Sequence, residues 1–280
     1  MIRLITDSAA DFEPGELERM QVTCIPLSVM FADKEYRENV DLTKDRFYEL
    51  LLAGSQNPKT SQASPQILID LFEQAHAQGD GAIYITLSSA LSGTYQTAVM
   101  TLNMLGYEDC HVVDSLNATG GQRLLVEYAV KLRDEGKNAE EIIQSLENIR
   151  DRIVLYACIN TLEYLYRGGR ISQTAYKLGT LANIKPIIEV DTQGRVGVPA
   201  KAMGMRKGMD CLCKRVEERK PDDNFPFYVM YTNNIDVARE LAQRLAKNGR
   251  EVPDNRIIQV GAAIGSHIGP DACGIVYVGE

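Results

Sequence analysis

The feature that most constrains the fold is a strand–turn–helix unit over residues 82–105. The apolar, β-branched run 82–87 follows a Gly-Asp-Gly turn and predicts a buried strand. Residues 95–105 carry apolar side chains at helical spacing and predict a helix. The turn between them, 88–94, is rich in Ser, Thr and Gly. Its N–H groups, its hydroxyls and the positive end of the helix dipole would face one spot, which suits an anion. Ser and Thr also cap helices for purely structural reasons, so both interpretations stay open here.

The first 150 residues continue the alternation of strand and helix. Strands are also predicted at 2–6, 22–31 and 110–113, and Pro26 marks an edge or a break in the second. Helices are predicted around 14–20, 43–54, 64–79 and 138–149, with a polar loop at 55–59. A further long helix, which carries Leu124 and Leu132, is predicted to follow the turn 114–121 and to end at Gly136. This order predicts a parallel sheet with helices packed against it.

The pattern changes after Arg150. Strands are predicted at 153–159, 186–190, 196–200, 227–232, 256–260 and 274–278, with helices near 205–219 and 237–248. Asp191-Thr192-Gln193-Gly194 predicts a hairpin, and the glycine-rich stretch 261–270 is expected to be a loop. Hairpins mixed with helices predict an α+β unit. We therefore expect two domains, residues 1–152 and 153–280.

Polar turns follow several of the predicted strands. Thr6-Asp7-Ser8, the turn 88–94 and Asp114-Ser115 each end a strand, and Thr60-Ser61-Gln62 adds a further polar segment. In parallel sheets, ligands bind outside the carboxyl ends of the strands. Although such loops are often Ser- and Asp-rich for no functional reason, the sequence favours a shared polar site over coincidence.

Composition argues against several classes of protein. The net charge of −8 disfavours a general nucleic-acid binder, because phosphate contacts need Lys and Arg. Six cysteines without a C-x-x-C pair fit a reducing cytoplasm, and three histidines leave little for a histidine-rich metal site, so we expect no metal. Asp7 interrupts the apolar N-terminal segment before that segment reaches the length of a signal peptide. No apolar run in the sequence is long enough to span a membrane.

A set of motifs, taken together, resembles one known family. The motifs are, in order, Thr6-Asp7-Ser8, Thr60-Ser61-Gln62-Ala63-Ser64-Pro65, Ser88-Ser89-Ala90-Leu91-Ser92-Gly93-Thr94-Tyr95, Asp114-Ser115, Leu162-Glu163-Tyr164-Leu165 with Gly168-Gly169-Arg170-Ile171, and Ile264-Gly265-Ser266-His267-Ile268-Gly269-Pro270. Their order and types resemble the DegV family of bacterial fatty-acid-binding proteins, over essentially the whole chain.

The resemblance implies both a fold and a function. The first domain would be a three-layer α/β/α unit and the second a two-layer α+β unit on a mixed sheet, with the ligand between them. The ligand would be a long-chain fatty acid, and no cofactor is implied. Such proteins are carrier subunits of bacterial fatty acid kinase, which phosphorylates the carboxyl group and so feeds phospholipid synthesis. The chain would be non-catalytic on its own and cytoplasmic, with at most transient contact with a membrane.

The same resemblance suggests particular site residues. Thr60, Ser61, Ser92, Gly93 and His267 would bind the carboxyl group, with His267 placed on the tight glycine-rich loop. Histidine can donate as a neutral ring or as a cation.

Two arginines are assigned separately from those residues. Arg170 and Arg206 would serve phosphate transfer or docking of the kinase, because an arginine fork suits phosphate. A surface salt bridge and a solvated helix end explain these two arginines equally well.

Two other functions remain as alternatives. An acyl hydrolase could use Ser92, Asp114 and His267, which occur in the chain order of α/β-hydrolases. However, the G-x-S-x-G elbow is absent, and a triad is defined by geometry rather than order. A DNA-binding regulator ranks lowest, since the chain is acidic and lacks a recognisable helix-turn-helix.

Overall fold

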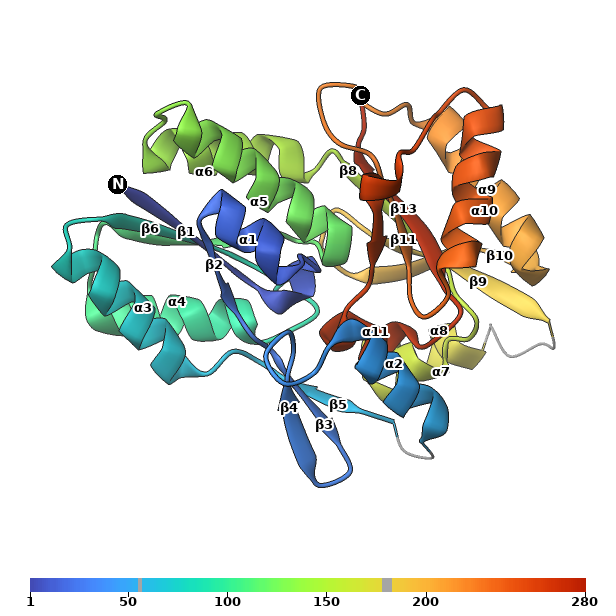
Figure 1. The fold of residues 1–280 in the computed structure, drawn as a ribbon, viewed down its shortest axis with the longest axis horizontal. Helices are drawn as coiled ribbons and strands as arrows, with labels where there is room; N and C mark the ends of the chain where they lie inside the picture. Colours follow the sequence, from blue (N-terminus) through green and yellow to red (C-terminus); the bar gives the residue numbers. More distant parts are fainter. Residues whose placement is uncertain (55–56, 178–182) are drawn as a thin grey trace.

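A four-stranded and a six-stranded sheet lie side by side, and a small third sheet lies below the junction in Figure 1. This computed structural model describes residues 1–54, 57–177 and 183–280. Residues 55–56 of the predicted polar loop lie outside the described residues.

The four-stranded sheet is parallel throughout, as the alternation of strands and helices predicts. Its order is β2 (Val22–Ile25), β1 (Ile2–Asp7), β6 (Gly81–Thr86) and β7 (Cys110–Asp114). Helices α3 (Pro65–Ala77) and α4 (Thr94–Leu105) cover one face, and α1 (Pro14–Met20), α5 (Thr119–Asp134) and α6 (Ala139–Arg150) lie on the other (Figure 1). The predicted three-layer α/β/α arrangement is therefore confirmed.

The six-stranded sheet is mixed. Its order is β10 (Val196–Met203), β9 (Ile184–Val190), β8 (Ile153–Cys158), β13 (Cys273–Val278), β11 (Tyr228–Tyr231) and β12 (Ile257–Gln259). The pair β11–β12 is parallel and the other pairs are antiparallel, including the predicted β9–β10 hairpin. Helices α9 (Gly204–Glu218) and α10 (Ile235–Lys247) cover one face, and a short 3-10 turn, η2 (Asp254–Arg256), precedes β12. This mixed sheet with its covering helices confirms the α+β fold predicted for the second half of the chain.

Helix α5 lies between the two large sheets and contacts strands of both. Gly120 in its first turn shows how close the approach is. A Cβ added there would clash with Val276 of β13 and come within 3.2 Å of the Met230 sulfur. One continuous hydrophobic core therefore joins side chains from both sheets.

The third sheet divides a run that the sequence predicts as one strand. Residues 22–31 form β2 and, beyond Pro26, β3 (Ser28–Phe31), which pairs with β4 (Lys34–Arg37) and β5 (Lys59–Ser61). The predicted break at Pro26 is confirmed, and it transfers the chain from one sheet to another. Helix α2 (Lys44–Ala53) lies beside this small sheet (Figure 1).

The prediction of a loop over 261–270 is wrong, because Ala262–Ile268 forms helix α11. The glycines that suggested a loop have a packing reason instead. A Cβ at Gly265 would lie 2.6 Å from the Tyr48 hydroxyl and 2.7 Å from the Phe47 ring, so this helix can approach α2 only with glycine there. His267 is thus in the last turn of a helix and not on a loop.

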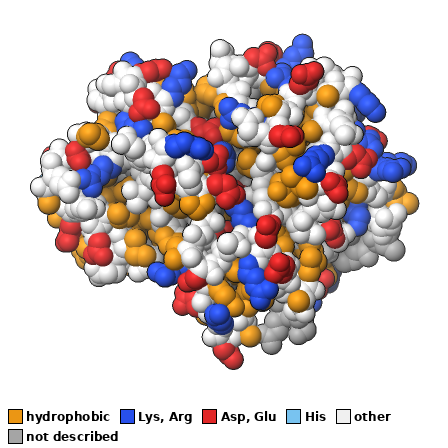
Figure 2. Space-filling view, in the orientation of Figure 1, with side chains coloured by type: hydrophobic (Ala, Val, Ile, Leu, Met, Phe, Trp, Pro, Cys, Tyr) orange, Lys and Arg blue, Asp and Glu red, His pale blue; other side chains and the backbone are white. Residues whose placement is uncertain are grey.

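Short elements complete the chain: η1 (Ser8–Ala10) follows β1, and α7 (Glu163–Arg167) and α8 (Gln173–Lys177) follow β8. The domain boundary at residue 152 stays a prediction; it falls in the turn between α6 and β8. Among the described residues, no helix is both long and apolar enough to cross a bilayer. On the face in Figure 2, basic side chains are interspersed with acidic ones.

Candidate functional site

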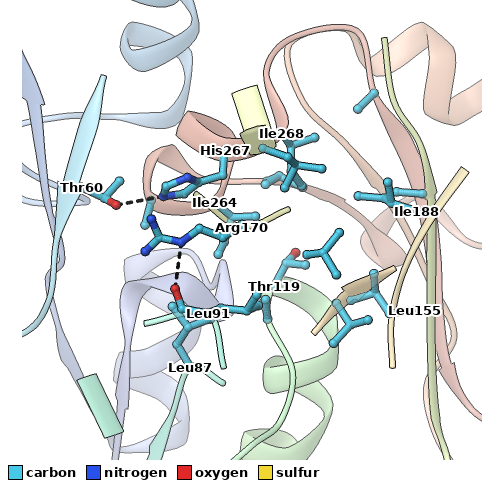
Figure 3. A pocket seen from close by; sticks show the side chains of 18 of the residues that line it. Thr60, Leu87, Leu91, Thr119, Leu155, Arg170, Ile188, Ile264, His267 and Ile268 are labelled. Atoms are coloured by element: carbon cyan, nitrogen blue, oxygen red, sulfur yellow. Dashed lines mark hydrogen bonds between the residues drawn. The ribbon is translucent and has the colours of Figure 1, made fainter. Parts of the chain in front are cut away.

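A cavity of about 380 Å³ is bounded by α11, the turn after β6, the small sheet and the six-stranded sheet. Its polar lining residues gather at one end and its aliphatic ones at the other, as Figure 3 shows for Thr60, His267 and Arg170 against Leu155 and Ile188. The polar end is formed by Thr60, Ser61, Gln62, Ser92, Gly93, Arg170 and His267. The five predicted carboxyl-binding residues and Arg170 therefore line one cavity.

Thr60 and His267 make the central contact of the polar end. Thr60 lies on β5, which pairs with β3 in the small sheet, and His267 lies on α11. The Thr60 Oγ1 and His267 Nε2 atoms are 2.9 Å apart. Burial, with a smaller effect from the positive charge of Arg170, lowers the pKa of His267 to about 4. The imidazole is therefore neutral at pH 7 and can donate one hydrogen bond without carrying charge.

The turn after β6 supplies the second side of the polar end. The Ser92 hydroxyl lies 2.9 Å from that of Thr94 and accepts a bond from the Thr94 amide, so it is held against the first residue of α4. Gly93 precedes the helix, and a side chain there would clash with Gln62. Ser61, Gln62 and Gly93 are exposed, so this end of the cavity reaches solvent.

Arg170 brings a positive charge into the same end. Its Nε donates to the Leu91 carbonyl at 2.9 Å, and its Nη1 donates to the Gly168 carbonyl. Burial lowers its pKa, and among the described residues it forms no ion pair with a carboxylate. A half-buried guanidinium that is not neutralised by any carboxylate in the described part of the chain favours an anionic ligand.

The far end of the cavity is a floor of side chains from the six-stranded sheet. Cross-strand pairing aligns Ile188 of β9, Ala157 of β8, Gly274 of β13 and Met230 of β11 in one row, and all four line the cavity. The two central residues of the row, Ala157 and Gly274, have the smallest side chains, so the cavity is deepest above them. Ile264 and Ile268 of α11 also line the cavity. This end suits an alkyl chain.

Two of the predicted polar turns do not line the cavity but hold the turn that does. Asp7 is fully buried and accepts bonds from the Leu87 amide and the Tyr84 hydroxyl. Asp114 accepts from the amides of Ser89 and Leu116. The polar residues at the ends of β1 and β7 therefore hold the turn 88–94 in place and do not themselves line the cavity.

The structure does not assemble the hydrolase triad. No hydrogen bond of the described residues joins His267 to Ser92 or Asp114, and Asp114 is occupied by backbone amides. The second ring nitrogen of His267, Nδ1, has no hydrogen-bond partner there and lies against Gly168. A general base needs a carboxylate or carbonyl to orient it, so this geometry does not support nucleophilic catalysis.

The two predicted docking arginines lie apart. Arg170 is in the cavity, whereas Arg206 lies in the first turn of α9, is 86% exposed and has its Nε 3.9 Å from Glu240. Within the described part of the chain, no group of three or more potential metal ligands comes together.

Sequence reasoning missed the cavity floor and Gln62. Gln62 was visible in the Thr-Ser-Gln motif, but its role depends on its contact with Gly93. The row from Ile188 to Met230 comes from four strands, so only the strand register identifies it.

Comparison with known proteins gives a consistent match over the full length. A family model described as "Uncharacterised protein, DegV family" matches residues 1–280. A DegV domain-containing protein of Clostridium perfringens is 32% identical over 284 residues, covering 99% of this chain and 97% of the relative. Another, of Caldanaerobacter subterraneus, is 32% identical over 279 residues, covering 99% and 98%.

Solved structures share the fold. A DegV family protein from Thermus thermophilus, described by its fatty acid binding, superimposes with a TM-score of 0.89 at 30% identity, covering 100% of this chain and 99% of that one. A stearic acid-binding protein from Eubacterium ventriosum gives 0.88 at 25% identity, covering 99% and 98%. DegV of Bacillus subtilis, a fatty acid binding protein, gives 0.85 at 28% identity, covering 100% and 99%.

Proposed function

Because the chain belongs to the DegV family, we propose that it binds one long-chain fatty acid in the cavity described above. The carboxyl group lies at the polar end, beside Thr60, Ser92, His267 and Arg170. The alkyl chain lies over the row from Ile188 to Met230. The observation that carries this proposal is the combination of an aliphatic cavity with a guanidinium at its polar end that forms no ion pair with a carboxylate of residues 1–54, 57–177 and 183–280.

The physical chemistry of the two ends supports a fatty acid over a purely apolar lipid. A carboxylate removed from water must be fully hydrogen-bonded, and the hydroxyls of Thr60 and Ser92, the neutral imidazole and the guanidinium are suitable donors. The alkyl chain supplies most of the binding energy, at about 0.8 kcal/mol for each CH₂ group buried. A ligand with a charged head and a long apolar tail satisfies both ends at once.

We expect Thr60→Ala and Ser92→Ala each to weaken binding of oleate by about 1–3 kcal/mol, because each leaves a carboxylate oxygen without a donor. Isothermal titration calorimetry at pH 7.5 measures the affinity, and circular dichroism confirms that each variant is folded. Ser145→Ala is the matched control, since Ser145 is a partly exposed serine on α6 that donates to the Glu141 carbonyl and does not line the cavity. Wild-type affinity in both cavity variants would place the carboxyl group elsewhere.

Beyond binding, we propose that the chain acts in the cytoplasm of a bacterium as the carrier subunit of a fatty acid kinase. It would be non-catalytic on its own and would present the carboxyl group for acyl-phosphate formation. The exposed residues at the polar end support this, because a carboxyl group there is close to solvent. The acyl-phosphate would then feed phospholipid synthesis.

For the kinase step, the exposed Arg206 is a candidate docking residue. Arg206→Ala is expected to bind oleate normally but to form acyl-phosphate several-fold more slowly with the kinase and ATP. Formation is followed by trapping the product as a hydroxamate. Wild-type turnover by this variant would remove Arg206 from the kinase surface.

A further inference from the structure

Two buried carboxyl groups outside the cavity converge on the first turn of α11. The Asp11 Oδ1 atom accepts a hydrogen bond from the Gly261 amide at 2.8 Å, and the Glu38 Oε1 atom accepts one from the Ala263 amide at 3.2 Å. A Cβ added at Gly261 would clash with Glu38 and come within 2.9 Å of the Asp11 oxygen. Both carboxyl groups therefore border the same small space.

The pair is almost completely removed from water. Asp11 and Glu38 are each 1% exposed. Their second oxygens, Asp11 Oδ2 and Glu38 Oε2, have no hydrogen-bond partner among the described residues. Two adjacent ionised carboxylates with unsatisfied buried oxygens are unfavourable, and one retained proton relieves both problems.

The charged and titratable groups around the pair do not fully neutralise it. Lys44 of α2 is the nearby cation, and its Nζ donates to the Asp11 backbone carbonyl and to Glu13. Arg123 of α5 also faces Asp11 but is paired with Glu16 and Glu127. Tyr48 donates to the Val260 carbonyl, and Cys24 faces Glu38 as a neutral thiol whose pKa is raised by burial.

The pair is connected to the cavity in two ways. It holds the N-terminal end of α11, whose later residues Ile264, His267 and Ile268 line the cavity. In addition, Thr119, which lines the cavity, lies close enough to Asp11 to lower the pKa of that carboxyl group. A change at the pair therefore acts on residues that we expect to touch the ligand.

We propose that Asp11 and Glu38 are positioning residues for fatty-acid binding, and that their carboxyl groups share one proton while they fix the first turn of α11. This inference rests on the proposed function. It adds a dependence of binding on pH that the cavity residues do not themselves supply between pH 6 and 8.

The direction of that dependence follows from the charges. Burial, followed by the charge of Asp11, raises the pKa of Glu38 to about 7, and burial raises the pKa of Asp11 to about 6. The stability from a retained proton is fully present below the unfolded-state pKa and is lost as the pH rises through 6 to 7. A fatty-acid carboxylate beside His267 adds negative charge near the same helix and favours the proton further. Affinity should therefore fall as the pH rises.

The test is the affinity for oleate at pH 6 and pH 8, measured by calorimetry on the full chain. If the bound acid raises the pKa of the pair by one unit, wild-type affinity falls by about fivefold between these values. Glu38→Gln can keep the bond to Ala263 and resembles the protonated group, so its affinity should be high and nearly independent of pH. Glu38→Ala loses the bond and should bind more weakly at both pH values.

The pH profiles of a control variant and of the wild type separate a failure of this inference from a failure of the proposed function. Glu13→Gln is the matched control, because Glu13 contacts the same Lys44 but is exposed, and in the described structure it makes no hydrogen bond to α11. It should keep the wild-type pH profile. A wild-type protein that binds no oleate at either pH overturns the proposed function. A wild-type protein that binds oleate, with an unchanged pH profile in Glu38→Gln, overturns the inference alone. So does Glu38→Ala if it is folded and binds as tightly as the wild type.

Discussion

Replacing Arg170 by alanine should lower the affinity for oleate by about 30- to 1,000-fold, or roughly 2–4 kcal/mol. The guanidinium is half-buried at the polar end of the cavity and forms no ion pair with a carboxylate of the described residues. Its removal leaves the bound carboxylate without a positively charged partner beside it. Calorimetric titration of purified, delipidated protein measures the loss.

Arg206→Ala is the matched control, because the same substitution is made on an 86% exposed side chain outside the cavity. Its affinity should equal that of the wild type. Arg170→Lys separates charge from geometry, since lysine keeps the charge but loses the planar fork, and we expect an intermediate affinity. If Arg170→Ala is folded and binds oleate normally, the carboxyl group does not lie at this end, and the assignment of Arg170 to docking alone would regain support.

Shortening the acid from eighteen carbons to ten should weaken binding by up to about 6 kcal/mol, since each buried CH₂ group contributes about 0.8 kcal/mol. The aliphatic floor, the row from Ile188 to Met230, provides the burial. A competition series with saturated acids of even length measures the increment. Equal affinity for decanoate and stearate would show that the tail lies outside the cavity.

The floor itself can be tested with one substitution and a control. Ile188→Asn places an amide under the tail, so it should reduce the affinity for stearate much more than the affinity for decanoate. Ile67→Asn is the matched control, because Ile67 is exposed on α3 and does not line the cavity. Equal losses for both acids in Ile188→Asn would indicate general destabilisation rather than contact with the distal tail.

Local sequence pattern predicted most of the strands and helices because each segment has a clear period. The run 82–87 and the helix after it are confirmed as β6 and α4, and Pro26 marks a real break. The same reasoning failed at 261–270, where glycine richness indicated a loop. There the glycines allow α11 to approach Phe47 and Tyr48, which are more than two hundred residues away in the chain.

The candidate site was predictable only where its residues belong to local motifs. Thr60, Ser92 and His267 lie in such motifs, and all three line the cavity. The separation of Arg170 from Arg206 was not predictable, because two basic residues in the same half of the sequence look alike without their surroundings. The cavity floor depends on the register of four strands, and Glu38 lies in an unremarkable polar turn whose burial depends on α11.

Native mass spectrometry of the protein purified from bacterial cells, followed by lipid extraction, tests the central claim most directly. The account predicts one bound molecule per chain, without any added lipid, with the mass of a fatty acid of about sixteen to eighteen carbons, since long tails bury most CH₂ groups. A protein that carries no fatty acid under native conditions, and takes up neither palmitate nor oleate when these are added, would contradict it.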